Sequence, residues 1–157
     1  MNIGMIVYSQ TGNTLDVLKK IKLDLENEGH TAAIDRVEIS GDPAQGASAI
    51  TITNAPDPVK YEAVIFASPV QAFSLALPMK KYMSGISGLE GKKTACFVTK
   101  QLPFKWTGAS HALSQMSDFC RSAGSAPVGT DFVIWSSKQR EADIDAASEK
   151  LAGIFSS

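Results

Sequence analysis

Short apolar runs alternate along the chain with longer stretches in which apolar side chains recur every three or four positions. The short runs are typical of parallel strands that are buried on both faces of a sheet. The longer stretches have the spacing of one helix face. This alternation predicts an α/β fold whose parallel strands are joined by right-handed crossovers. The predicted strands are 3–8, 30–39, 63–67, 94–99 and 127–135, and the predicted helices are 13–28, 76–85, 109–123 and 139–155.

The pattern is irregular between the second and third predicted strands. The apolar phase slips between Ile34 and Val37, so we expect a bend or bulge there. Residues 40–60 contain turn signals and a short alternating segment, but nothing periodic enough for a crossover helix. We therefore expect residues 36–40 and 49–53 to pair as a hairpin, with the second crossover helix short or missing.

A polar loop, Ser9-Gln10-Thr11-Gly12-Asn13-Thr14, joins the first strand to the first helix. The N–H groups in the first turn of a helix lack intrahelical partners and lie at the positive end of its dipole, so they can receive an anion. Three hydroxyls and one amide add donors, and Gly12 allows the backbone to approach closely. The loop has no Lys or Arg, which fits a phosphate held by neutral donors and not a magnesium-bound triphosphate. A Ser/Thr-rich turn that only caps the helix is the alternative interpretation.

The motif Ser9-x-Thr11-Gly12-x-Thr14 after an N-terminal strand resembles the phosphate loop of the flavodoxins, and the element order is similar to theirs over nearly the whole chain. The resemblance implies that this loop binds the 5′-phosphate of flavin mononucleotide (FMN). It also implies a flavodoxin-like three-layer sandwich, with residues 1–157 as a single domain and a five-stranded parallel sheet of order 2-1-3-4-5. Such a sheet binds its ligand beyond the carboxyl ends of its strands, where the strand order switches. That rule selects three loops, which are 9–14, 68–73 and 99–108.

The second and third of these loops resemble the flavodoxin loops around the isoalloxazine ring. The resemblance implies that Val70 or Phe73 packs on the ring and that backbone amides of the third loop bind its pyrimidine edge. Phe104 and Trp106 are candidate stacking groups, and local core packing is the alternative for each aromatic. No catalytic residue is predicted. The predicted FMN-binding residues are Ser9, Gln10, Thr11, Gly12, Asn13, Thr14, Ser68, Pro69, Val70, Gln71, Ala72, Phe73, Thr99, Lys100, Gln101, Leu102, Phe104, Trp106 and Gly108.

The three loops contain no carboxylate, but the third contains Lys100 and Lys105. Reduced flavin carries negative charge near its N1 atom. A unit charge pair about 4 Å apart interacts by roughly 4 kcal/mol at an effective dielectric of about 20. We hypothesise that a lysine near N1 makes the reduction potential less negative than that of an acidic flavodoxin. The alternative is that both lysines are solvated surface groups.

Composition narrows the class of partner. The formal net charge of -1 argues against a nucleic-acid surface. No apolar run approaches membrane-spanning length, and no signal peptide is evident. Cys96 and Cys120 form no Cys-x-x-Cys motif, so we expect free thiols and a cytoplasmic location.

Other functions on the same topology require residues that this chain lacks. A response-regulator receiver needs acidic residues where Ser9 and Ser68 stand, and a cysteine phosphatase needs Cys-x5-Arg in the first loop. His111 has no Gly-x-Ser-x-Gly motif to serve in a hydrolase. Two distant histidines and two distant cysteines predict no metal site.

Two functions remain. The first is an FMN protein that passes electrons between redox partner proteins. The second is an FMN-dependent NAD(P)H reductase of quinones or a similar small electron acceptor. A near-neutral charge weakens the steered docking of an acidic carrier, and Ala67-Ser68-Pro69 followed by the helix at 79–82 is similar to the quinone-reductase branch. The chain lacks the long insertions that build a nicotinamide pocket in that branch, which favours the carrier. A flavin-binding domain with a regulatory or storage role is a third interpretation, and enzyme activity and oligomeric state stay open.

Overall fold

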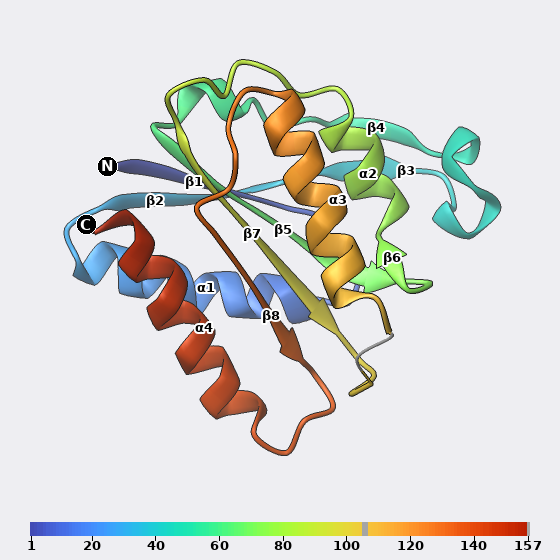
Figure 1. Cartoon of the computed structure of the whole chain (residues 1–157). Helices are drawn as coiled ribbons and strands as arrows, with labels where there is room; N and C mark the ends of the chain where they lie inside the picture. The colour runs from blue at the N-terminus through green and yellow to red at the C-terminus, as the bar shows by residue number, and fades with distance from the viewer. Residues whose placement is uncertain (105–106, 157) are drawn as a thin grey trace.

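A computed structural model describes residues 1–104 and 107–156 of the chain (Figure 1). Lys105 and Trp106 of the predicted third loop, and Ser157, lie outside the described residues. The strands are β1 (Asn2–Val7), β2 (Thr31–Arg36), β3 (Glu38–Ser40), β4 (Thr51–Asn54), β5 (Ala63–Gln71), β6 (Ser74–Leu75), β7 (Lys93–Lys100) and β8 (Gly129–Ile134). The helices are α1 (Asn13–Asn27), α2 (Leu77–Met83), α3 (Ala109–Ser122) and α4 (Arg140–Phe155).

The central sheet confirms the predicted strand order. In the described part of the chain, β2, β1, β5, β7 and β8 pair in parallel in that order, which is 2-1-3-4-5 when the short extra strands are left out. Met5 in the middle of β1 is opposite Ile34 of β2 and Ile65 of β5. The strand order switches between β1 and β5, so the loops that follow these two strands lie side by side at one edge.

Helices cover both faces of the sheet (Figure 1). Because successive residues of a strand point to opposite faces, the buried side chains form two cores. Met5 and Phe97 belong to the core with α1 and α4, whereas Ile6 and Cys96 belong to the core with α2 and α3. These layers confirm the three-layer sandwich. Within the residues that the structure describes, no helix is long and apolar enough to cross a membrane.

The irregular stretch after β2 forms the predicted hairpin. The strand is interrupted at Val37, between the end of β2 and the start of β3, although the N–H of Val37 still donates to the carbonyl oxygen of Val7 at 2.8 Å. β3 and β4 then pair antiparallel with one register shift. In the described structure between them, the helical turns are the 3₁₀ segments Pro43–Gln45 and Ala47–Ala49. The hairpin therefore replaces the second crossover helix.

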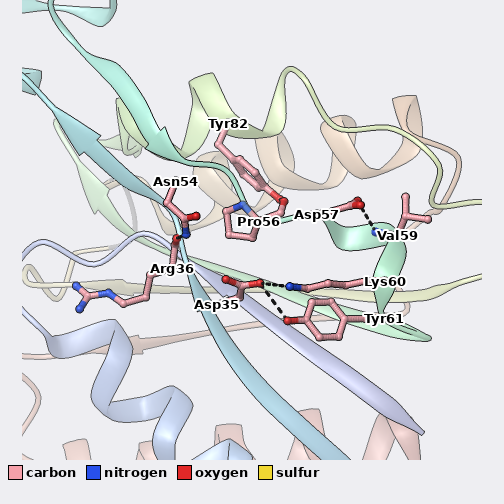
Figure 2. Close-up of polar contacts among 9 residues, drawn as sticks. All are labelled: Asp35, Arg36, Asn54, Pro56, Asp57, Val59, Lys60, Tyr61 and Tyr82. Atoms are coloured by element: carbon pink, nitrogen blue, oxygen red, sulfur yellow. Dashed lines mark hydrogen bonds and ion pairs between the residues drawn. The ribbon is translucent and has the colours of Figure 1, made fainter.

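Two side chains of α2 hold this hairpin against the rest of the molecule. Nζ of Lys81 donates to the carbonyl oxygen of Ile50 at 2.6 Å and to that of Ala47 at 3.3 Å. The buried Tyr82 hydroxyl donates to the carbonyl oxygen of Pro56, just after β4 (Figure 2). The Tyr82 bond satisfies a buried carbonyl group of an irregular segment. The Lys81 bonds tie residues 47–50 to α2.

Asp35 on β2 anchors the segment that leads into β5 (Figure 2). Its carboxylate accepts a hydrogen bond from the Tyr61 hydroxyl at 3.1 Å and lies 3.0 Å from Nζ of Lys60. The Tyr61 ring in turn covers Gly4 on β1, because a Cβ atom added at Gly4 would lie 2.2 Å from a ring carbon. Tyr61 thus occupies the space that a side chain at position 4 would need.

Tyr82 makes the fold less stable at alkaline pH. Burial raises the pKa of Tyr82, so the folded state favours the neutral phenol. Its stabilising contribution is complete below the pKa of an unfolded tyrosine, about 10, and is lost as the pH rises above that value. We expect Tyr82→Phe to lower the free energy of unfolding by about 1–3 kcal/mol at neutral pH, because the Pro56 carbonyl loses its donor. The difference between the two proteins should shrink above pH of about 10.

Urea unfolding of wild type and Tyr82→Phe at several pH values measures this effect. Tyr8→Phe is the control, because the described residues offer the Tyr8 hydroxyl no hydrogen-bond partner although burial raises the pKa of Tyr8. A Tyr82→Phe protein as stable as wild type at neutral pH would contradict the role of this hydroxyl.

The two cysteines are 24 positions apart in the sequence but meet in the core. Their Sγ atoms, from β7 and α3, are 3.9 Å apart, and both thiols are free and fully buried. The hydrogen bond with Cys120, together with burial, raises the pKa of the Cys96 thiol. The folded protein therefore holds Cys96 as an unreactive thiol and not as a thiolate.

Candidate functional site

The three predicted loops converge at the carboxyl edge of the sheet. Nε2 of Gln71 donates to Oε1 of Gln10 at 2.6 Å, which joins the second loop to the first. The hydroxyls of Thr14 and Thr99 lie 2.7 Å apart, which joins the first loop to the third. Direct contacts thus bring together three segments that are far apart in the sequence.

The first loop leads directly into α1 and leaves the amino end of that helix without a side-chain cap. Gly12 occupies the N-cap position with a φ of 91°, a conformation that L side chains rarely adopt. Its N–H donates to Oγ of Ser9 at 3.2 Å, which closes the turn. Gln10 and Thr11 are exposed, and Asn13 is half-buried. The loop is therefore a cradle of uncharged donors beside the unpaired N–H groups of a helix end.

Thr14 differs from its neighbours in the loop because it is buried. Its side chain reaches the buried Thr99 at the end of β7. A hydroxyl has one proton and two lone pairs, so a bond between two hydroxyls leaves one proton for a further acceptor. The pair can hold α1 against β7 and still donate once to a ligand.

The segment predicted as the second loop is mostly strand, which corrects the expected loop at 68–73. β5 continues through Gln71 and pairs antiparallel with β6. Only Ala72 and Phe73 form the turn, with φ values of 49° and 61°. Two successive positive φ values are typical of a two-residue hairpin turn, although Gly and Asn are the residues that usually adopt them. β6 follows β5 after a turn of two residues, and a strand of two residues is too short to give a periodic signal in the sequence.

The predicted residues of this segment differ in what they offer a ligand. Ser68 is fully buried, and its Oγ donates to the carbonyl oxygen of Pro69. Pro69 and Val70 are half-buried. Phe73 is 51% exposed at the turn, and its backbone lies against Gly108, where an added Cβ would be 2.4 Å from the Phe73 carbonyl. The second and third loops therefore touch.

The third loop folds around the side chain of Lys100. Lys100 is only 5% exposed, and its Nζ donates to the carbonyl oxygen of Phe104 at 2.9 Å and to Oγ1 of Thr107 at 3.0 Å. The Thr107 hydroxyl in turn contacts the carbonyl oxygens of Leu102 and Phe104. Burial lowers the pKa of Lys100. Lys100 is thus not the solvated surface group that was its alternative interpretation.

Three other described residues of the third loop face outward. Gln101, Leu102 and Phe104 are exposed. Gly108, with a φ of 104°, is the N-cap of α3, which also has no side-chain cap. Trp106 lies outside the described residues, so its predicted stacking role stays a prediction.

Two cavities flank the β5–β6 turn. The small cavity lies between the second and third loops, has a volume of about 130 Å³, and is lined by Val70, Ala72, Phe73, Lys100, Gln101, Leu102 and Thr107. The large cavity lies on the side of the turn that faces α2, has a volume of about 460 Å³, and is lined by Gln10, Asp42, Pro43, Ala44, Gln71, Ala72, Ser74, Leu75, Leu77 and Lys80. Ala72 borders both.

Sequence analysis did not predict the large cavity. Its walls include Asp42 and Ala44 from the hairpin and Lys80 from α2. Asp42 belongs to a turn signal and Lys80 to a helix pattern, and neither pattern indicates a cavity. The hairpin that stands in place of a crossover helix supplies part of the wall of this cavity beside the first loop.

Many solved structures of flavodoxins match the chain over its whole length. Oxidised flavodoxin 2 from Bacillus cereus has a TM-score of 0.69 at 18% identity, with 99% of this chain and 100% of that chain covered. A mutant of flavodoxin from Pseudomonas aeruginosa has a TM-score of 0.70 at 14% identity, with 98% and 97% covered. A flavoprotein in complex with FMN from Lactobacillus acidophilus has a TM-score of 0.61 at 16% identity, with 92% and 97% covered. The chain therefore has the flavodoxin fold. No family model and no curated protein match its sequence.

Proposed function

We propose that this protein binds FMN at the three converging loops and carries electrons between protein partners. The observation that supports it most is the meeting of a glycine-capped helix start, preceded by a loop without charged side chains, with the two loops after β5 and β7. Flavodoxins have the same fold, and a flavoprotein with that fold was solved with FMN.

The first loop suits the phosphate end of the cofactor. Thr11 and Asn13 offer side-chain donors, and the first turn of α1 offers backbone N–H groups without a side-chain cap. The absence of Lys and Arg from residues 9–14 fits a monophosphate that is held by hydrogen bonds alone. These donors would fix the phosphate and direct the rest of the nucleotide toward the second loop.

The small cavity suits the pyrimidine edge of the ring. When bound, FMN supplies a ring that accepts and returns electrons. Leu102 and Phe73 would shield it from water, and Lys100 would place a positive charge beside it. At about 130 Å³ the cavity is smaller than the roughly 300–1,000 Å³ of typical ligand pockets. We therefore expect the turn at Ala72 and Phe73 to move away from Gly108 when the ring binds.

The large cavity favours a second candidate function, an FMN-dependent reductase of small acceptors. It adjoins the first loop through Gln10 and the second loop through Gln71, and its volume of about 460 Å³ is that of a small-molecule site. Lys80 would give it a cation for an anionic donor or acceptor. A reductase needs such a site beside its flavin, whereas a carrier of electrons between proteins does not.

Flavin titrations test the proposed site. We expect FMN to bind at least about 100-fold more tightly than riboflavin, which lacks the phosphate, since hydrogen bonds to a charged group contribute about 1.5–3 kcal/mol each and about 1.4 kcal/mol is tenfold. Quenching of flavin fluorescence by the purified protein measures both affinities. Equal affinities for the two flavins, or no binding of either, would contradict the proposal.

Anaerobic mixing with pyridine nucleotides distinguishes the two functions. We expect the FMN-loaded protein to be reduced by dithionite but to keep its visible absorbance in NADH and NADPH. Rapid bleaching by either nucleotide, followed by recovery on adding a quinone, would favour the reductase and overturn the carrier.

A further inference from the structure

Lys100 is a buried ammonium group with neutral partners. It comes from the last residue of β7, and its Nζ bonds a carbonyl oxygen and a hydroxyl of its own loop. The Phe132 ring on β8 lies 5.5 Å from it. In residues 1–104 and 107–156, the ion pairs of the structure join other residues and leave Lys100 without a carboxylate.

Such a charge is costly unless an anion comes near it. Taking an ammonium group out of water is unfavourable, and neutral hydrogen-bond partners offset this only in part. Burial lowers the pKa of Lys100 for the same reason. An anion that entered the adjoining small cavity would compensate the charge in an environment where Coulomb interactions are weakly screened.

The small cavity is where such an anion would form. Lys100 lines it together with Val70 and Phe73 of the second loop and Leu102 of the third, so the residue borders the cavity while its Nζ is bonded within its own loop. The predicted first and second loops contain no ionisable side chain, and Glu and Asp are absent from residues 99–108. No acidic side chain of these loops therefore neutralises Lys100.

We infer that Lys100 sets the redox preference of the proposed site by stabilising the reduced, anionic flavin over the oxidised, neutral flavin. The inference rests on the proposed function, since it requires FMN at these loops. Two-electron reduction adds two electrons and one proton to the ring and leaves one negative charge, which lies near N1. The partner protein or dithionite supplies the electrons, and water supplies the proton.

Three variants separate the charge of Lys100 from its structural bonds. Lys100→Met removes the charge and keeps a long apolar stem. Lys100→Arg keeps the charge and the donors. Thr107→Val keeps Lys100 but removes the hydroxyl that ties it to the loop. If Lys100 only holds the loop in place, Lys100→Met and Thr107→Val should each weaken the binding of oxidised FMN and of reduced FMN by the same factor.

The measurement is the affinity of each protein for oxidised FMN, by fluorescence quenching, and for reduced FMN, from the midpoint potential of the complex. We expect Lys100→Met to weaken the binding of reduced FMN about tenfold more than the binding of oxidised FMN. This difference lowers the two-electron potential by about 30 mV. Lys100→Arg and Thr107→Val should keep the wild-type ratio of the two affinities within about threefold. An unchanged ratio in Lys100→Met would overturn the inference.

Wild type alone provides a second test that does not depend on a variant that folds. We expect the two-electron potential of bound FMN to be no lower than that of free FMN. If the affinity of wild type for reduced FMN were more than tenfold lower than its affinity for oxidised FMN, the inference would be wrong. The proposal that the protein binds FMN would still hold. If wild type bound no FMN, the proposed function and this inference would fail together.

Discussion

Replacing Gly4 with alanine is expected to lower the free energy of unfolding by about 3 kcal/mol, the upper part of the range for overpacking a core. The added Cβ would lie 2.2, 2.4 and 2.5 Å from three carbons of the Tyr61 ring. β1 is held between β2 and β5, so its backbone has little freedom to move. Tyr61 is buried, and its hydroxyl is bonded to Asp35, so the ring cannot turn away without losing that bond.

Chemical denaturation of Gly4→Ala against wild type measures this effect. Gly153→Ala is the matched control, because Gly153 lies inside α4 and an added Cβ there meets no atom within 4 Å. Alanine in a helix interior is favoured over glycine, so this control should gain up to about 1 kcal/mol. A Gly4→Ala protein as stable as wild type would mean that the Tyr61 ring is not fixed over β1.

Replacing Gly12 with alanine is expected to weaken FMN binding by about 100-fold. A left-handed conformation costs an L residue about 1–2 kcal/mol, and Gly12 has a φ of 91° at the start of α1. Alanine would favour a different backbone path, and the N–H groups of the first turn would no longer converge on the phosphate. Losing even one hydrogen bond to a charged group costs about 1.5–3 kcal/mol, which is roughly 10- to 150-fold in affinity.

The other end of the same helix offers a close control. Gly29 follows α1 with a φ of 90°, and an added Cβ meets nothing within 4 Å at either glycine. Gly12→Ala and Gly29→Ala should therefore lose similar stability, by about 1–2 kcal/mol. Only Gly12→Ala should lose affinity for FMN. If both variants bound FMN as wild type does, the first loop would not be the phosphate site.

Local sequence signals were sufficient for most of the fold. The buried strands appear as apolar runs because a parallel sheet that is covered on both faces has no solvent-facing positions. The hairpin of β3 and β4 was predictable because residues 40–60 combine turn residues with alternation and lack a helix period. The interruption between β2 and β3 at Val37 lies where the apolar phase slips in the sequence.

The candidate site was predictable only as three loops. The topology rule identifies which loops meet, and the residues 9–14 indicate the kind of ligand. Whether a loop residue points inward is decided by contacts that the pattern of apolar and polar residues does not reveal. Ser68 is buried, β5 extends beyond its predicted end to pair with β6, and Lys100 turns inward beneath its loop.

The sequence by itself determined the α/β class and the alternation of strands and helices, because hydrophobic periodicity is a local property. The strand order and the three loops followed from the resemblance to the flavodoxins, together with the rule that a ligand binds where the strand order switches. Only the tertiary structure decided the 3.9 Å approach of Cys96 and Cys120, the cavities on either side of the β5–β6 turn and the burial of Lys100. Those features depend on which side chains fill the space between elements far apart in the chain. A period of apolar residues says which face is buried, but not what it is buried against.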